Sequence, residues 1–320
     1  MGATPMEDHQ HCLYLVLALV SLLVILLAKR RRSAAAPEHG LRLPPGPWQL
    51  PIIGSLHHMI GKLPHHAMRD LARRHGPLML LQLGEVPTLV VSSREAAREV
   101  MRTHDAVFAT RPMSPTMRAL TDGGRGIIMA PYGAHWRQLR RITITKLLSA
   151  RRVNSFRAVR EEEAAAMLRV CAAAAAESRA VNMRERLSEL ITDTTMRAAM
   201  GDRIKDREVL LRALDEAIVL AAGFNPADLW PSSRIVSWLS SAVRRSEEIR
   251  QTSFGILDEI IKDHLERMER GDGGEVEDLL DVLLKVQKDG ELPIPLDTDV
   301  IKVAITVSNL QLINQFNPIR

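Results

Sequence analysis

Cysteine is nearly absent from this sequence. The 320 residues contain two, Cys12 and Cys171. A disulfide framework needs several paired cysteines and a four-cysteine zinc site needs four, so the composition excludes both. The scarcity agrees with a reducing, cytosolic environment for the bulk of the chain.

Aromatic side chains are also scarce, at four tryptophans, two tyrosines and five phenylalanines. Because proteins that bind single-stranded nucleic acid stack bases on aromatic rings, we expect no nucleic-acid partner. The phosphate loop G-x-x-x-x-G-K-[ST] and the nucleophile elbow G-x-S-x-G are missing. Histidines form local pairs at positions 9 and 11, 57 and 58, and 65 and 66. We predict no metal site there, since stable zinc sites use three or four ligands.

One uncharged apolar run is present, at residues 13–28, and four basic residues follow it at 29–32. The run is slightly shorter than the ~20 residues that span a bilayer. Snorkelling of Lys29 and Arg30 supplies the missing reach. We predict that residues 1–28 are a single-pass anchor in membrane lipid, with the bulk of the chain in the cytosol. A cleaved signal peptide is the alternative, but its positive charge would precede the apolar run.

A proline-rich segment, Leu43-Pro44-Pro45-Gly46-Pro47, comes next. Proline fixes φ and favours an extended path. We therefore interpret residues 29–50 as a basic stop followed by a hinge that spaces the body from the membrane.

The net charge of +5 is unevenly distributed. Residues 61–160 contain 18 basic and 6 acidic side chains, whereas residues 161–320 contain 20 basic and 29 acidic ones. The basic block indicates an acidic partner, an anionic ligand or a membrane surface. Solvated helix faces are the alternative interpretation of most of these arginines.

The periodicity of the body predicts a mainly α-helical protein with a small β element. Two β-like runs, 78–83 and 88–92, are joined by residues 84–87 and indicate a hairpin. Ser92 and Glu95 match a capping box that opens a helix ending near residue 104. Residues 105–133 are rich in glycine and proline and predict loops. The spacing of apolar residues predicts helices over 65–75, 187–200, 207–222, 235–269 and 276–288.

Trp136 and Arg140 are four residues apart on a predicted helix, so they share one face. An indole N–H and a guanidinium on one face can together hold a carboxylate. Packing of the tryptophan beside a surface charge is the alternative.

The sequence around this pair resembles a known family. Residues 130–141 read APYGAHWRQLRR and follow Phe108-Ala109-Thr110-Arg111-Pro112. Together with the proline-rich hinge, NPADLWP at 225–231, EDLLDVLL at 277–284 and LPIP at 292–295, they resemble plant cytochrome P-450 monooxygenases, in particular those that oxidise terpenoids. The resemblance covers about residues 13–305.

The resemblance implies a cytochrome P-450 fold and a haem cofactor, with Trp136 and Arg140 binding a haem propionate. It implies substrate contacts from the 113–129 loop and from the segment at 221–231, and we take Met113, Met117, Ile127, Ile128 and Phe224 as candidates. Its further implications are an NADPH-cytochrome reductase docking near Arg137 and Arg141, a small lipophilic substrate, and a location in the endoplasmic reticulum membrane.

The resemblance breaks off near residue 305, and residues 306–320 form a divergent tail. The sequence contains no acid-threonine pair, no E-x-x-R pair and no F-x-x-G-x-R-x-C-x-G loop in matching positions. A thiolate ligand on the haem iron favours O–O cleavage, and neither Cys12 nor Cys171 lies in a suitable loop. We therefore expect an incomplete cytochrome P-450 domain over 51–305, catalytically inactive alone, which an altered transcript would explain. The alternatives are an enzyme with a different axial ligand and a non-catalytic, membrane-anchored partner of the reductase or of full-length relatives.

Overall fold

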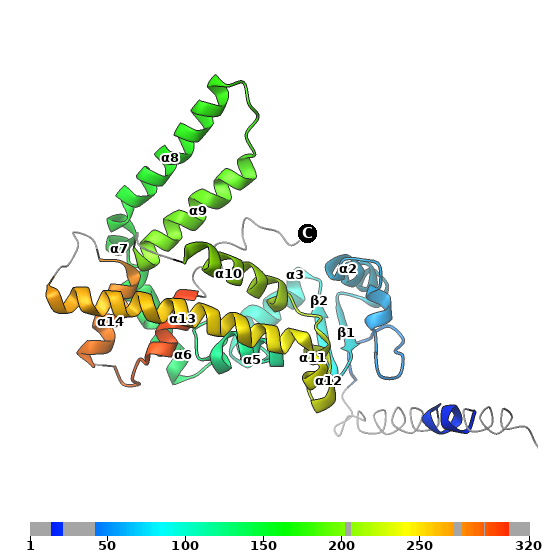
Figure 1. The fold of residues 1–320 in the computed structure, drawn as a ribbon. Helices are drawn as coiled ribbons and strands as arrows, with labels where there is room; N and C mark the ends of the chain where they lie inside the picture. The colour runs from blue at the N-terminus through cyan, green and yellow to red at the C-terminus, as the bar shows by residue number, and fades with distance from the viewer. Residues whose placement is uncertain (1–13, 22–41, 202–205, 272–276, 291, 307–320) are drawn as a thin grey trace, which may run out of the picture. The chain divides into compact units, whose positions relative to one another are not determined.

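The computed structural model describes residues 14–21, 42–201, 206–271, 277–290 and 292–306 (Figure 1). Residues 14–21 are helical. Within the described ranges, no helix combines the length and the apolar character needed to cross a bilayer. Most of the predicted anchor, the basic stop at 29–32 and the tail from 307 to 320 lie outside them.

Contacts between residues divide the described chain into two units. The first ends at Asp105 and also includes Leu229–Ser233. The second comprises Ala106–Asp228 and the described residues from Arg234 onward. Each unit is described by itself below.

The first unit is built on the predicted hairpin. Strands β1 (Leu78–Leu83) and β2 (Val86–Val91) pair in antiparallel register. The second strand starts two residues earlier than predicted, because Val86 already pairs with Leu83 and leaves a two-residue turn. Gly84 begins this turn at φ +62°, a conformation that glycine adopts without steric cost.

Helix α2 (Pro64–His75) packs against β1. Every second residue of β1 is buried, since successive side chains of a strand point to opposite faces. The core of this unit consists of Met59, Ala67, Leu71, Met79, Leu81 and Leu83. Met59 ends a short 3-10 helix, η1 (Leu56–Met59).

The described part of the proline-rich segment lies against β1. The backbone N–H of Leu80 donates to the Pro45 carbonyl oxygen at 2.9 Å. A Cβ atom on Gly46 would lie 2.1 Å from the Leu80 carbonyl oxygen, so only glycine allows this backbone approach. The spacer role of the segment stays a prediction.

The predicted capping box at 92–95 is wrong by one residue. Helix α3 (Arg94–Arg98) is capped by Ser93, whose hydroxyl oxygen accepts the N–H of Ala96 at 3.1 Å. This register places Ala96, not Glu95, at the third helical position. Alanine has no side-chain oxygen to accept the backbone N–H of Ser93, so the second hydrogen bond of a capping box cannot form. A π-helical turn, η2 (Glu99–Thr103), continues the element to residue 103.

All the regular secondary structure in the described part of the second unit is helical (Figure 1). Its helices and helical turns are α4 (Asp105–Phe108, at the unit boundary), α5 (Pro115–Leu120), η3 (Asp122–Gly124), α6 (Ala134–Ile142), η4 (Thr143–Leu147), α7 (Ala150–Ser155), α8 (Arg157–Ala176), α9 (Met183–Met200), α10 (Arg207–Ala221), α11 (Pro226–Leu229), α12 (Arg234–Leu239), α13 (Ser241–Arg270) and α14 (Leu279–Asp289), followed by helical residues 298–306.

Two stretches differ from the prediction. The loop-rich stretch at 105–133 contains α4, α5 and η3, and Ser114 caps α5 ahead of Pro115. The predicted helix at 235–269 is two helices, because the backbone of Ser240 is extended (φ −73°, ψ 113°) and ends α12 before α13 begins.

The main core of the second unit joins α6, α9, α10, α13, α14 and the residues 298–306. Its fully buried members include Leu214, Leu257, Leu280 and Ile301. Figure 1 shows α8 and α9 as a hairpin and α10 running along α13. This packing fixes the helices that surround the candidate site.

Candidate functional site

A cavity of about 900 Å³ opens within the second unit. Its volume lies in the usual range of small-molecule and cofactor sites. α6 contributes Trp136 and Arg140, the loop before it contributes Ile127 and Ile128, and the helical residues 298–306 contribute Ala304. α9 and the first residue of α14 provide further wall, through Thr194, Thr195, Ala198, Ala199 and Leu279.

The position of α6 is fixed by its buried face, which carries Gln138, Leu139 and Ile142. Leu139 and Ile142 are buried in the main core. Gln138, 4% exposed, donates from Nε2 to the Ile294 carbonyl oxygen at 2.6 Å and accepts the Ile294 N–H at 3.0 Å. Because these bonds satisfy a buried amide side chain and a loop backbone together, they hold α6 in one register.

Trp136 and Arg140 lie side by side, as their spacing predicts. The guanidinium carbon of Arg140 is 5.1 Å from the Trp136 ring centroid, which is a cation–π distance. The indole N–H of Trp136 donates to the Ile127 carbonyl oxygen at 3.1 Å. A carboxylate bound here can therefore use Arg140 directly, and the indole only after it leaves Ile127.

The cavity is lined by cations and by no acidic residue. Arg111, Arg140 and Arg160 are on its walls, and none of the lining residues is aspartate or glutamate. Arg111 donates to the Ile128 carbonyl at 3.0 Å, and Arg160 donates to the Val153 carbonyl at 2.8 Å. Within the described ranges, no carboxylate forms an ion pair with these three guanidiniums. The cavity suits an apolar ligand that carries negative charge at its edge.

The helical segment that carries Ala304 is held by an ionic network. Asp297 caps it by accepting the N–H of Val300 at 2.8 Å. Lys302, whose side chain is 8% exposed, pairs with Asp258 at 2.5 Å and Asp299 at 3.2 Å. Arg125 pairs with Asp297 at 2.8 Å and Asp299 at 3.1 Å. This network fixes one wall of the cavity.

The pKa values of these groups reflect the pairing. Burial alone would lower the pKa of Lys302, and its hydrogen bonds to Asp258 and Asp299 more than offset burial, so the pKa is raised. Burial likewise opposes the effect of Lys302 on Asp299, whose pKa is lowered. Both groups are therefore charged at neutral pH.

The structure brings together four of the seven residues that the sequence suggested. Trp136, Arg140, Ile127 and Ile128 line the cavity, whereas Met113, Met117 and Phe224 do not. The methyl group of Met113 packs against Gly124, and Phe224 follows α10 at φ +64°. The functional roles of all seven stay predictions.

Sequence reasoning missed Arg111 and Arg160 as cavity residues. Arg111 is in the FATRP stretch that contributed to the resemblance, so this motif could have indicated Arg111 as a site residue. Arg160 is in the first turn of α8, and no local motif distinguishes it from a surface arginine.

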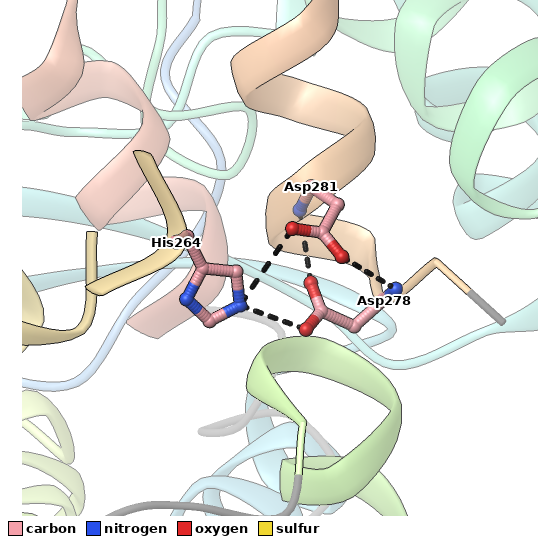
Figure 2. A group of neighbouring side chains, drawn as sticks. All are labelled: His264, Asp278 and Asp281. Atoms are coloured by element: carbon pink, nitrogen blue, oxygen red, sulfur yellow. Dashed lines mark hydrogen bonds and ion pairs between the residues drawn. The ribbon is translucent and has the colours of Figure 1, made fainter. Parts of the chain in front are cut away.

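A second cluster is buried away from this cavity's lining. His264 of α13 meets Asp278 and Asp281 at the start of α14, and Figure 2 shows the three side chains pointing toward one another. These are the histidine and acidic residues, in the described ranges, that lie close enough to hold an ion. The local histidine pairs considered in the sequence are not part of the cluster.

Comparisons with known proteins agree on one family. The sequence profile of the family described as Cytochrome P450 matches residues 44–309. Dolabradiene monooxygenase of Zea mays is 44% identical over 297 residues, which cover 92% of this chain and 58% of the maize protein. Zealexin A1 synthase of Zea mays is 45% identical, over 87% of this chain and 55% of that protein. 5-Epiaristolochene 1,3-dihydroxylase of Nicotiana tabacum is 37% identical, over 90% of this chain and 58% of that protein.

The chain spans a little more than half the length of these curated relatives. Among solved structures, a zebra fish cytochrome P450 determined with progesterone matches with a TM-score of 0.59 and 23% identity. The match covers 77% of this chain and 56% of that chain. At this identity the likeness concerns the fold, and it agrees with a mainly helical body and a small two-stranded sheet.

Proposed function

This chain belongs to the cytochrome P450 family, and on that premise we propose that it forms the haem-binding half of a monooxygenase that oxidises lipophilic small molecules. The observation that carries the proposal is the acid-free cavity with Arg111 and Arg140 on its wall.

The residues present fit a haem. The group is a flat apolar ring with two propionates, and the cavity joins apolar walls to guanidiniums that no described carboxylate neutralises. Arg140 and Arg111 would hold the propionates by charge-assisted hydrogen bonds. Trp136 would join them by exchanging its bond to the Ile127 carbonyl. Haem with a thiolate ligand supplies O–O bond cleavage.

The substrate class follows from the apolar residues of the cavity wall. Ile127, Ile128 and Ala304 present apolar surface with no charge, so they would exclude water and select an apolar substrate. Terpenoids are the class we propose, because two of the relatives are named for dolabradiene and 5-epiaristolochene. Met113, Met117 and Phe224 remain our candidates for further substrate contacts.

We propose that the 320 residues alone do not carry out the oxidation. Cys171 lies half-buried on α8 and does not line the cavity, and Cys12 lies outside the described residues. A charged hydrogen bond to a propionate contributes about 1.5–3 kcal/mol, which does not replace a metal–sulfur bond.

Membrane lipid and an NADPH-dependent reductase are the partners we propose. The apolar run at 13–28 would anchor the chain in the endoplasmic reticulum membrane with its bulk toward the cytosol. Three residues of α12, Ile235, Trp238 and Leu239, are highly exposed, Trp238 by 84%, and would add contact with lipid. Arg137 and Arg141 are exposed on α6 and would meet an acidic reductase.

The test is haem titration of the purified 320-residue chain, followed by reduction under carbon monoxide. We expect saturable binding of one haem and no Soret band of the thiolate-ligated type. Absence of saturable binding would refute the cavity as a haem site. A thiolate-type band with turnover of a terpenoid would refute the proposed inactivity of this chain.

A further inference from the structure

The strongest unassigned feature is the cluster of His264, Asp278 and Asp281. His264 is 2% exposed and comes from the last third of the 30-residue helix α13. Asp278 is the N-cap of α14 and Asp281 is its third helical residue. The cluster therefore joins two helices through two buried side chains, His264 and Asp278, and the partly buried side chain of Asp281.

The hydrogen bonds of His264 define its protonation. One ring nitrogen, Nδ1, lies 2.8 Å from the Ile260 carbonyl oxygen, which can only accept. The other, Nε2, lies 2.8 Å from Asp278 Oδ2. Because acceptors face both nitrogens, the imidazole satisfies its partners fully only when it carries two protons and Asp278 carries none.

The two aspartates already have partners for their other oxygens. Asp278 Oδ1 accepts the N–H of Asp281 at 2.9 Å, and Asp281 Oδ2 accepts the N–H of Asp278 at 3.3 Å. This reciprocal pair is a capping box that starts α14. Asp278 thus caps α14 with one oxygen and binds α13 with the other.

The charged groups around the imidazole come from two helices. Asp278 and Asp281 face it from α14, with Asp281 Oδ1 at 3.9 Å, and Arg267 acts on it from α13. From α9, the C-terminal Gly201 lies against Asp278, where a Cβ atom would be 3.1 Å from Oδ2. Burial lowers the pKa of His264, but the hydrogen bond and charge of Asp278 outweigh it, and the pKa is raised.

We propose that His264 and Asp278 form a proton-dependent latch that holds the start of α14 against α13. The latch is closed while both ring nitrogens carry protons. When the Nε2 proton leaves to solvent hydroxide, two lone pairs face each other at 2.8 Å, and the contact becomes repulsive. Leu279, the residue after Asp278, lines the large cavity, so opening the latch loosens one of its walls.

The direct test is NMR of the ring nitrogens in the full chain, labelled with ¹⁵N-histidine and assigned with His264→Gln. As the pH is raised, we expect the signal of His264 to keep the imidazolium pattern to a higher pH in the folded chain than in the chain unfolded by urea. If the His264 ring loses its second proton at the same pH in the folded and the unfolded chain, the latch is refuted. The variant serves only to assign the signal, and the titration itself is carried out on the wild-type chain.

Hydrogen exchange tests the coupling to α14. His264→Gln and Asp278→Asn are each expected to lower the protection of the first turn of α14 by about tenfold, the effect of one charge-assisted hydrogen bond. The exposed residue His66 serves as the matched control, and His66→Gln is expected to leave α14 unchanged. Unchanged protection in both latch variants would refute the coupling.

Zinc titration separates a proton from a metal as the occupant. We expect added Zn²⁺ to leave the melting temperature of the wild-type chain unchanged, because both ring nitrogens of His264 and both carboxylate oxygens of Asp278 are already hydrogen-bonded. Stabilisation by Zn²⁺ in the wild type that is lost in His264→Gln would show a metal site and overturn the proton latch.

Discussion

At the residue scale, Gly126 and Val303 show how closely the loop before α6 approaches the last described helical segment. A Cβ atom added to Gly126 would lie 2.3 Å from Val303 Cγ1. This contact connects the residues just before Ile127 to the segment that carries Ala304, so it shapes two walls of the cavity.

We predict that Gly126→Ala destabilises the chain by about 1–3 kcal/mol, since overpacking forces Val303 or the loop to move. Gly255 is the matched control. It is exposed inside α13 with no atom near its Cβ position, and Gly255→Ala is expected to stabilise by about 0.5–1 kcal/mol. Denaturant unfolding of both variants measures the difference. Equal stability of the two would contradict the close approach.

Arg140 is the residue on which the anion-binding property of the cavity depends most. We predict that Arg140→Ala weakens haem binding about 10- to 100-fold, from loss of one charge-assisted hydrogen bond. Arg137→Ala is the control, because Arg137 lies on the same helix over the Tyr132 ring and does not line the cavity. Absorbance titration measures both affinities. An equal effect of the two substitutions would indicate a general charge effect.

At the element scale, caps decide where helices begin. Ser93, Ser114 and Ser149 each accept a backbone N–H at the start of a helix. The sequence around 92–95 offers two serines in succession, and a sequence pattern alone does not distinguish which one is the cap.

We predict that Ser93→Ala costs about 1 kcal/mol of unfolding free energy and that Ser92→Ala costs close to nothing. Ser93 supplies the oxygen that binds the N–H of Ala96, whereas the backbone N–H of Ser92 donates to Pro77 and its side chain caps no helix. Thermal unfolding of the two variants checks the assignment. A larger loss in Ser92→Ala would restore the capping box predicted from the sequence.

At the scale of the whole molecule, stability depends on pH in opposite directions in the acid and the alkaline range. A paired carboxylate stabilises the fold less as the pH falls, and a paired histidine stabilises it less as the pH rises. A hydrogen bond from Lys285, followed by one from Arg152, lowers the pKa of Glu277. A depressed carboxyl pKa contributes stability that is present above the unfolded value and is lost as pH falls through the folded value. The raised pKa of His264 contributes stability that is complete below its unfolded value and is lost as pH rises.

We therefore predict a dome-shaped stability profile, falling below about pH 4.5 and again above about pH 6.5. Glu277→Gln is expected to reduce the acid limb and His264→Gln the alkaline limb. Melting temperatures across the pH range measure both limbs. A variant that lowers the melting temperature equally at every pH would show that the replaced group has the same pKa in the folded and the unfolded chain.

Much of the architecture was predictable because its signals are local. The hairpin, α2, α9, α10 and α14 follow from apolar periodicity and turn residues, and their bounds differ from the predictions by a few residues. The break at Ser240 was not predictable, since a serine inside a helical pattern is tolerated, and packing of α13 decides that the chain bends there.

The sequence by itself determined the family, the helical class and the pairing of Trp136 with Arg140, because spacing along one helix and short motifs do not depend on distant residues. Only the tertiary structure decided that Arg111 and Arg160 join Arg140, that the Trp136 indole binds the Ile127 carbonyl, and that His264 meets Asp278. Those contacts join residues on different elements. Burial and charge compensation among packed helices set them, and no local pattern records that packing.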